Sequence, residues 1–470
     1  MAEVRQISGL WKFKGLAVEV PGDLFVNEDT HTITLRFTIN MGMSEAERIF
    51  PRNTRVDYIY GTSVDGRPYV ICGGVVNVNR FTFDGRGCLG YGEVVVWYVF
   101  DGLRFSEEAQ LSIRRLTVDF GEIVGWARIC NFMVRKDESS RSSYSWNRIS
   151  QAELQLSAND FIYFNSGVNL PGELGWERKL TLWQNVDVNF CYPPLMEWRH
   201  AIVDVRRIRE IISFATGRRI GVVSAKASIL TDGDKEQNVK VFFGDQLVSD
   251  AKQPQILEYI FTLPELARVA KKTKNFGDLF DTIQPALELY LSPLVTDEKT
   301  IRVQFLSMMQ GIELLHAIWR GNNAVTIIDG LKARYGQKLD RFDADKRFFF
   351  GLGGFTEKTY VGLRMRLWDL FFRKDEWPCK YPFGMSFGDF VNKLKVSRDY
   401  YTHYNPEEKE KAFTEEELCD LNRFLKAIFT YHMLRYFGFD EDFALARMWF
   451  DAPGLCKLFK TPANTEEWDA

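Results

Sequence analysis

The chain of 470 residues is long enough for two or three domains, and its 46% hydrophobic and 26% charged residues exclude a wholly disordered protein. A net charge of −3 excludes binding to nucleic acid through a global positive field, so any such contact must come from a local basic patch. The seven cysteines form no Cys-x-x-Cys pair and the five histidines have no metal-ligand spacing, so we expect neither a disulfide framework nor a metal or other cofactor.

Short strands are predicted throughout the first part of the chain. Residues 32–39 alternate strictly between apolar and polar side chains, which is the period of a half-buried strand. Turn dipeptides such as Asp65-Gly66 and Asp84-Gly85 separate runs of this kind. The pattern predicts a β-sandwich or a β-barrel. The other runs are 69–78, 93–100, 116–120, 152–156, 161–164 and 179–190.

The period of the apolar residues changes after these strands. An amphipathic helix is predicted at 202–216, and residues 220–230 and 239–243 are predicted to form a hairpin. From about residue 255 the period is helical. We therefore predict a β-rich domain at 1–250 that includes the helix near 202–216, a helical domain at 251–460 and an acidic tail at 461–470.

Two helices of the second half are well marked. Apolar residues recur on one stripe from Ile301 to Trp319, which predicts a core helix of a bundle. Thr414 and Glu417 have the spacing of a capping box, and Gly438 ends the last long helix. Together with the preceding strands, these patterns predict an α+β protein of several domains, with a β-rich domain followed by an all-α bundle.

The segment Arg398-Asp-Tyr-Tyr-Thr-His403 lies on a predicted helix that starts at Ser386 and should stop at about Asn405, because Pro406 follows. Arg is a permanent cation whose forked donors fit phosphate oxygens, and His exchanges a proton near neutral pH. Metal-free RNA cleavage needs only these two kinds of functional group. On a straight helix the spacing places the two side chains roughly 140° apart. One copy aims both at one phosphate only if the helix end unwinds; otherwise a second copy must complete the site.

Cations and aromatic residues surround this segment. Lys393 and Lys395 precede Arg398, and Tyr400 and Tyr401 follow it. Cations contact RNA phosphates and aromatic rings stack on unpaired bases, so these four neighbours are candidate RNA-binding residues. Solvated lysines and core tyrosines on an amphipathic helix explain the same grouping.

Three further signals have ordinary structural interpretations. Glu313 and His316 share one side of the helix at 301–319, where they form either part of a catalytic pocket or a polar edge of the core, and we assign His316 to the core. Gly85-Arg-Gly-Cys-Leu-Gly90 matches a dinucleotide-binding pattern, but a strand-like run follows it where a helix is required, so we predict a hairpin turn. Residues 351–354 are glycine-rich and lack the Lys-Ser/Thr end of a phosphate-binding loop.

The spacing of Arg398 and His403, with a polar residue after the Arg, resembles the signature of HEPN ribonucleases. Residues 385–438 resemble the HEPN domain of ApeA-type anti-phage defence proteins, and the helix at 305–316 is similar to an earlier core helix of that family, which carries a Glu. The N-terminal opening, residues 8–35, resembles the β-rich N-terminal domain of the same family. Asp399 stands where the family commonly has Asn, and HEPN signatures accept Asp there.

The resemblance implies an all-α HEPN-like bundle that acts as a metal-independent endoribonuclease in abortive anti-phage defence. RNA would be cleaved by attack of a 2′-hydroxyl, which leaves a 2′,3′-cyclic phosphate. Arg398 and His403 would be catalytic, supported by Asp399 and Glu313. The implied partners are RNA, a second copy in a dimer or higher oligomer, and a phage-derived protein or nucleic acid as trigger, with the N-terminal domain restraining or triggering the nuclease. The alternative is a non-catalytic dimerising interaction or sensor protein with a structural helical bundle.

We expect this protein in the cytoplasm, without membrane contact. Its longest apolar run, residues 94–100, is far shorter than the about 20 residues of a helical span. The N-terminus Met1-Ala-Glu-Val-Arg5 lacks the apolar core of a signal peptide.

Overall fold

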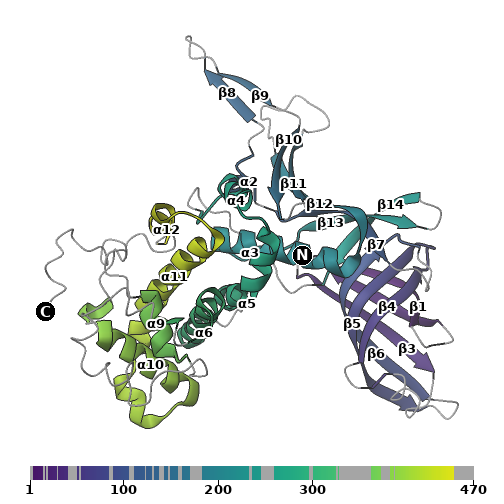
Figure 1. The fold of residues 1–470 in the computed structure, drawn as a ribbon. Helices are drawn as coiled ribbons and strands as arrows, with labels where there is room; N and C mark the ends of the chain where they lie inside the picture. Colours follow the sequence, from purple (N-terminus) through teal and green to yellow (C-terminus); the bar gives the residue numbers. More distant parts are fainter. Residues whose placement is uncertain are drawn as a thin grey trace. The chain divides into compact units, whose positions relative to one another are not determined.

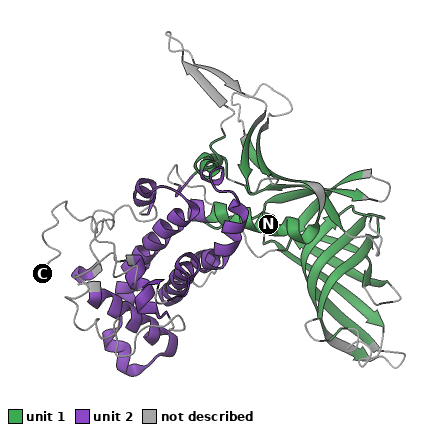
Figure 2. Ribbon diagram, viewed as in Figure 1, with its two compact units in different colours: residues 1–213, 218–257, 262–268 green, residues 214–217, 258–261, 269–470 purple. Residues whose placement is uncertain are grey.

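The computed structural model divides the chain into two compact units, which Figure 2 shows in green and purple. The first unit contains residues 1–213, 218–257 and 262–268, and the second contains residues 214–217, 258–261 and 269–470. The structure describes residues 4–448 except 14–15, 17–18, 29, 41–49, 52–53, 84–87, 105–110, 122, 130–131, 137–141, 147–148, 157–160, 170–182, 232–234, 245–258, 296–299, 324–325, 328–360, 372–381 and 386.

Six antiparallel strands of the first unit close into a barrel, at the purple end of the chain in Figure 1. Their order is β6-β3-β2-β1-β4-β5, and β5 pairs with β6 to close the ring. Closure pairs the two outer strands with each other and so removes the free edges of the six-stranded sheet. The strands are β1 (Val4–Phe13), β2 (Val20–Asn27), β3 (Thr32–Asn40), β4 (Thr54–Ser63), β5 (Pro68–Phe83) and β6 (Cys88–Asp101).

Apolar and aromatic side chains fill the inside of the barrel. Side chains alternate between the two faces of each strand, so that Phe37 of β3 is buried while its neighbour Arg36 is exposed. Trp11 is fully buried, and its indole N–H donates to the carbonyl of Gly22 at 3.0 Å. A Cβ at Gly61 would overlap the indole ring of Trp11. A glycine at this position therefore makes room for the largest side chain of the core.

A second series of antiparallel strands branches from the barrel at β6. One edge of β6 pairs with β5 along its length, and the other pairs with β3 at residues 89–95 and with β14 at residues 98–101. From the branch, the order is β14 (Lys235–Phe243), β13 (Ser224–Thr231), β7 (Ser112–Asp119), β12 (Trp183–Glu197), β11 (Phe161–Asn169) and β10 (Ile149–Gln155). Between β7 and β10 lie the short helix α2 (Val124–Ala127) and a separate hairpin of β8 (Phe132–Lys136) and β9 (Ser142–Trp146).

Helix α3 (Trp198–Thr216) follows β12 without a break and is anchored at its first residue. The indole N–H of Trp198 donates to the hydroxyl of Tyr58 at 2.8 Å, and its ring packs edge-on against Tyr98 at 5.5 Å between centroids. Gly217 follows the helix with φ of 64°, the left-handed conformation common after a helix end. The aromatic anchor therefore fixes the start of α3 on the strand-rich unit.

The second unit is a helical bundle in which α6 is central. Helix α6 contacts α5, α9, α10 and α11, and its buried stripe includes Phe305, Met308, Ile312 and Leu315. None of the helices that the structure describes is long and apolar enough to cross a membrane. The helices, of which α4 lies on the unit boundary, are α4 (Leu263–Ala270), α5 (Phe276–Val295), α6 (Ile301–Arg320), α9 (Leu363–Phe371), η2 (Pro382–Gly384), α10 (Phe387–His403), η3 (Pro406–Lys411), α11 (Glu415–Phe437) and α12 (Glu441–Arg447).

The predicted order of a β-rich region followed by helices is confirmed, and of the two predicted β architectures the structure has the barrel. The hairpin of β13 and β14, the core helix α6 and the capping box of Thr414 and Glu417 are also confirmed. No individual strand was predicted at β1, β2, β4, β8 or β9, although residues 8–35 were assigned to a β-rich domain by resemblance. Phe83 of β5 pairs with Cys88 of β6, and residues 84–87 between them, where a hairpin turn was predicted, lie outside the described residues. Ser386, residues 351–354 and the tail at 461–470 lie outside the described residues.

Candidate functional site

Helix α10 carries both Arg398 and His403 and is fixed to the start of α11 by a buried set of hydrogen bonds. The hydroxyl of Ser397 donates to the carbonyl of Lys393 and accepts from the backbone N–H of Phe413, both at 2.7 Å. The hydroxyl of Tyr401 donates to the carbonyl of Phe413, also at 2.7 Å. Because Ser397 and Tyr401 face the core on either side of Arg398, they determine which direction the Arg398 side chain takes.

Arg398 is partly exposed and lies between two carboxylates. Its side chain is 33% exposed, and its guanidinium is 3.1 Å from a carboxylate oxygen of Asp399 and 3.7 Å from one of Glu313 on α6. Asp399 is also bound by Lys395 at 2.9 Å. Burial by itself would raise the pKa of Asp399, but Lys395 and Arg398 together lower it below its usual value. Asp399 therefore stays ionised and holds Arg398 through a charged hydrogen bond.

The pKa of Glu313 is shifted in the opposite direction to that of Asp399. Burial raises the pKa of its carboxyl, and the nearby charge of Asp399 raises it further, while Arg398 and Arg366 only partly oppose the rise. The carboxylate oxygen that faces Arg398 is buried and accepts no hydrogen bond within the part of the chain that the structure describes. Glu313 is thus a carboxylate in an unfavourable environment, held next to the Arg of the motif.

A buried polar network lies one helical turn further along α6. His316 is fully buried, its Nε2 is 3.0 Å from the Asp369 carboxylate, and its Nδ1 is 3.1 Å from an Arg366 guanidinium nitrogen. Arg has no acceptor, so Nδ1 of His316 must accept and the proton must be on Nε2, from which it is donated to Asp369. Arg366 also donates to Asn322 at 2.6 Å, and Arg320 lies 3.6 Å from Asp369. The network fixes one tautomer of a neutral His316.

The assignment of His316 to the core agrees with its burial, but Arg366, Asp369, Arg320 and Asn322 were missed. A weak signal was present, because α9 places a charged pair three residues apart within the otherwise apolar stretch 365–371. Such a pair in an apolar helix indicates buried partners. The partner helix could not be identified, since Asp369 is 53 positions from His316 along the chain.

His403 lies at the other end of the candidate site, as the last residue of α10, and is exposed. Among the described residues its side chain forms no hydrogen bond or ion pair. The helix continues unbroken from Arg398 to His403, so the two side chains leave it roughly 140° apart. Tyr404 follows with φ of 53°, and only there does the chain leave the helix.

The four candidate RNA-binding residues have different environments. Tyr401 is 6% exposed and bonded to the backbone of Phe413, which leaves no ring face for a base. Lys393 binds the Glu417 carboxylate at 3.0 Å and covers the Phe413 ring. Lys395 is exposed and Tyr400 is partly exposed. The positions of Tyr401 and Lys393 thus agree with the structural alternative, whereas Lys395 and Tyr400 lie at the surface.

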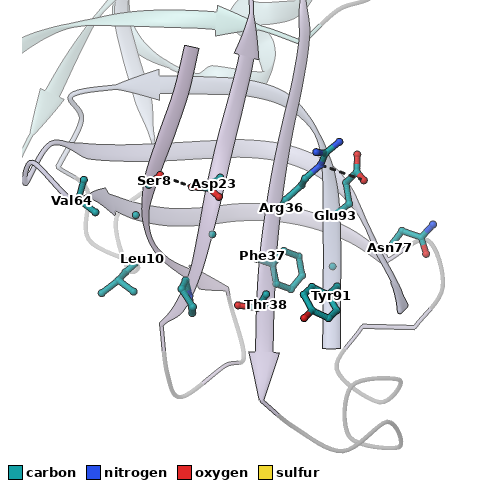
Figure 3. Close-up of a pocket in the computed structure, with 14 residues that line it drawn as sticks. Ser8, Leu10, Asp23, Arg36, Phe37, Thr38, Val64, Asn77, Tyr91 and Glu93 are labelled. Carbon is teal, nitrogen blue, oxygen red and sulfur yellow. Dashed lines mark hydrogen bonds and ion pairs between the residues drawn. The ribbon is translucent and has the colours of Figure 1, made fainter. Parts of the chain in front are cut away.

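The first unit has a separate feature, a groove of about 920 Å³ on the outer face of the barrel. Arg36 pairs with Glu93 at 4.0 Å and Ser8 donates to Asp23 at 2.5 Å. Figure 3 shows both pairs along the groove. Leu10 and Val64 line it with exposed apolar surface. Among the described residues, no cluster of three or more His, Cys, Asp or Glu is arranged to hold a metal ion.

Comparison with protein families matches ApeA N-terminal domain 1 to residues 6–273, more than half of the chain, and an Apea-like HEPN domain to residues 306–443. The chain belongs to the ApeA family. The first match contains the barrel and its branch, and the second contains Glu313, Arg398 and His403. No curated protein and no solved structure matches this ApeA-like chain.

Proposed function

We propose that this ApeA-like chain is a metal-independent endoribonuclease of the HEPN type that acts in abortive anti-phage defence. The observation that carries the proposal is the pair of Arg398 and His403 on one helix of an Apea-like HEPN domain, with Arg398 fixed by Asp399 and Glu313. The partners in this proposal are RNA, a second copy of the chain and a trigger from the phage, a protein or a nucleic acid. We place the reaction in the cytoplasm, where the RNA is, with the N-terminal domain regulating the nuclease.

The chemistry needs one proton carrier and one cation. A ribose 2′-hydroxyl gives up its proton and attacks the adjacent phosphorus, the bond to the 5′-oxygen breaks, and this oxygen takes up a proton. The products are a 2′,3′-cyclic phosphate and a 5′-hydroxyl. His403 transfers a proton as general base or acid, and Arg398 stabilises the negative charge on the phosphate oxygens in the transition state. Asp399 and Glu313 orient the guanidinium.

The active unit in this proposal is at least a dimer. Because α10 stays helical through His403, the helix end does not unwind to bring the imidazole next to Arg398 of the same copy. A two-fold axis beside α10 instead brings His403 of one copy toward Arg398 of the other, and it does so twice. Because Arg398 is partly exposed and His403 is exposed, both groups are accessible to such a partner.

The same geometry also supports a second candidate from another class. Arg398 is already paired with Asp399 and Glu313, as in a structural ion pair that holds α10 against α6. In that case the helical unit is a non-catalytic dimerising or sensor module. The two candidates differ in what Arg398 does: a catalytic Arg exchanges carboxylate for phosphate during binding, whereas a structural Arg keeps its carboxylates.

The deciding experiment is incubation of purified protein with total bacterial RNA in EDTA, with chemical identification of the fragment ends. We expect cyclic phosphate ends from the parental protein and a loss of at least roughly 10²-fold in rate for His403→Ala and Arg398→Ala. His200→Ala is the matched control, because His200 is 68% exposed, lies in the first unit and should not affect cleavage. An Arg398→Ala protein that cuts at the parental rate contradicts the proposal.

If no variant cuts, the assay is repeated in lysate from phage-infected cells, which supplies a trigger. Continued absence of cleavage there favours the non-catalytic module. A second readout is growth during overexpression, where toxicity that His403→Ala removes supports the nuclease.

A further inference from the structure

Tyr404, the residue after His403, has an unusual backbone conformation. Its φ of 53° lies in the left-handed region, which glycine and asparagine adopt readily and bulky residues rarely do. It follows the last residue of α10, and its N–H donates to the carbonyl of Tyr400 at 2.5 Å. Strain of this kind persists where the surroundings or the function require it.

The ring of Tyr404 is the exposed end of an aromatic series. It is 55% exposed and packs edge-on against Tyr400, with 5.8 Å between ring centroids. Tyr400 packs against Tyr401 at 4.9 Å, and Tyr401 packs against the buried Phe305 of α6 at 6.0 Å. Tyr404 is therefore supported from the core outward, and it still has ring surface in contact with solvent.

Arg302 of α6 lies near the side chain of Tyr404. Hydrogen bonds to Glu415 and to the side chain of Tyr404 raise the pKa of Arg302 above its usual value. The Tyr404 ring thus packs against Tyr400 of α10, and Arg302 of α6 lies beside its side chain. A fixed, exposed aromatic ring loses little entropy when a flat partner stacks on it.

The charges nearby favour a neutral partner over an anionic one. Helix η3, which follows Tyr404 in the chain, carries both acidic and basic residues, and Glu415 already neutralises Arg302. The Tyr404 ring thus has no unpaired cation of Arg302 beside it to bind a phosphate, whereas a nucleobase is neutral and stacks on any aromatic ring.

We propose that Tyr404 binds an unpaired nucleobase of the RNA, next to the phosphate on which His403 acts. The inference rests on the proposed ribonuclease function and adds a base-binding subsite to it. Stacking is tolerant of base identity, so the subsite selects single-stranded RNA rather than a particular sequence.

The test uses the full chain with His403→Ala, which prevents cleavage, and measures binding of a fluorescent single-stranded RNA oligonucleotide. Tyr404→Asn removes the ring while keeping a residue that tolerates the left-handed conformation. We expect it to weaken binding on the order of 10-fold. Tyr404→Phe is the matched control, because it keeps the ring and loses only the hydroxyl. The salt dependence of binding should not change with Tyr404→Asn, since no phosphate contact is removed.

The position of the base is found by scanning an abasic ribonucleotide along the oligonucleotide. If Tyr404 stacks on one base, the abasic substitution at that position weakens binding of the parent and abolishes the difference between Tyr404→Asn and the parent. Equal binding by Tyr404→Asn and its parent on every oligonucleotide, together with intact cleavage by the protein that retains His403, overturns this inference and leaves the nuclease. Absence of any RNA binding by the His403→Ala protein, together with absence of cleavage, overturns both.

Discussion

The interior of the barrel and the core of the helical unit differ in where their buried polar groups lie. The buried cluster of the barrel consists of hydrophobic side chains, and Asp101, a buried carboxylate, lies at the end of β6, bonded to Arg5 and Arg67. In the helical unit, His316 and Asp369 are almost completely buried between α6 and α9. Burying charged groups lowers stability unless each has its hydrogen-bond or ion-pair partner. When these partners are present, their bonds fix the geometry of the buried groups. Apolar packing therefore stabilises both cores, and the helical core additionally contains a polar arrangement of fixed geometry near the candidate site.

The largest expected effect on stability tests the barrel. Trp11→Ala removes a fully buried indole and should lower the free energy of unfolding by about 3–5 kcal/mol. Leu10→Ala is the control on the same strand, because Leu10 is 48% exposed and its loss should change stability by less than about 0.5 kcal/mol. Chemical denaturation of both variants measures the difference. Equal effects would show that the barrel interior does not determine its stability.

The next effect tests the buried network of the helical unit. Asp369→Ala leaves His316 and Arg320 without their carboxylate, and we expect a loss of about 3 kcal/mol. Asp420→Ala is the matched control, since Asp420 pairs with Arg423 at the surface and its removal should cost about 0–1 kcal/mol. If Asp369→Ala is as mild as the control, the network contributes no more than a surface pair.

Acid should destabilise the helical unit through His316. Burial lowers the pKa of His316 from its usual 6.5, Arg366 and Arg320 lower it further, and Asp369 only partly opposes them. The unfolded chain then takes up a proton more readily than the folded chain. The contribution of His316 to the free energy of unfolding is therefore complete above about pH 6.5 and decreases as the pH falls toward the lowered pKa. Unfolding by urea at about pH 7 and about pH 5 measures this loss, which His316→Gln should reduce. An unchanged loss in that variant would assign the acid sensitivity to other groups.

The smallest effect concerns Glu313. Its pKa is raised by burial, so the ionised carboxylate lowers stability as the pH rises through that pKa. Glu313→Gln removes the charge and should leave the protein as stable as the parent, or slightly more so, at neutral pH. Cleavage should decrease, because Arg398 loses one of the carboxylates that orient it. Thermal unfolding and the RNA assay separate the two effects, and reduced stability together with unchanged cleavage would make Glu313 purely structural.

Local patterns predicted what depends on neighbours in the sequence. Alternation along β3, the capping box of Thr414 and the left-handed Gly438 were all visible, because each depends on residues a few positions apart. Strand β4 was not predicted, since no clear alternation marks it, and its burial depends on pairing with β1 and β5. The choice between sandwich and barrel likewise required the β5–β6 pairing that closes the ring.

The features of the candidate site likewise fall into those that the sequence predicted and those that depend on tertiary packing. The sequence by itself determined Arg398, His403 and their spacing, because helix periodicity fixes the angle between side chains on one helix. Only the tertiary structure decided that Glu313 faces Arg398, that Asp369 and Arg366 enclose His316, and that Tyr401 is buried while Tyr404 is exposed. These facts depend on which helices meet, and packing between residues far apart in the chain leaves no fixed spacing in the sequence.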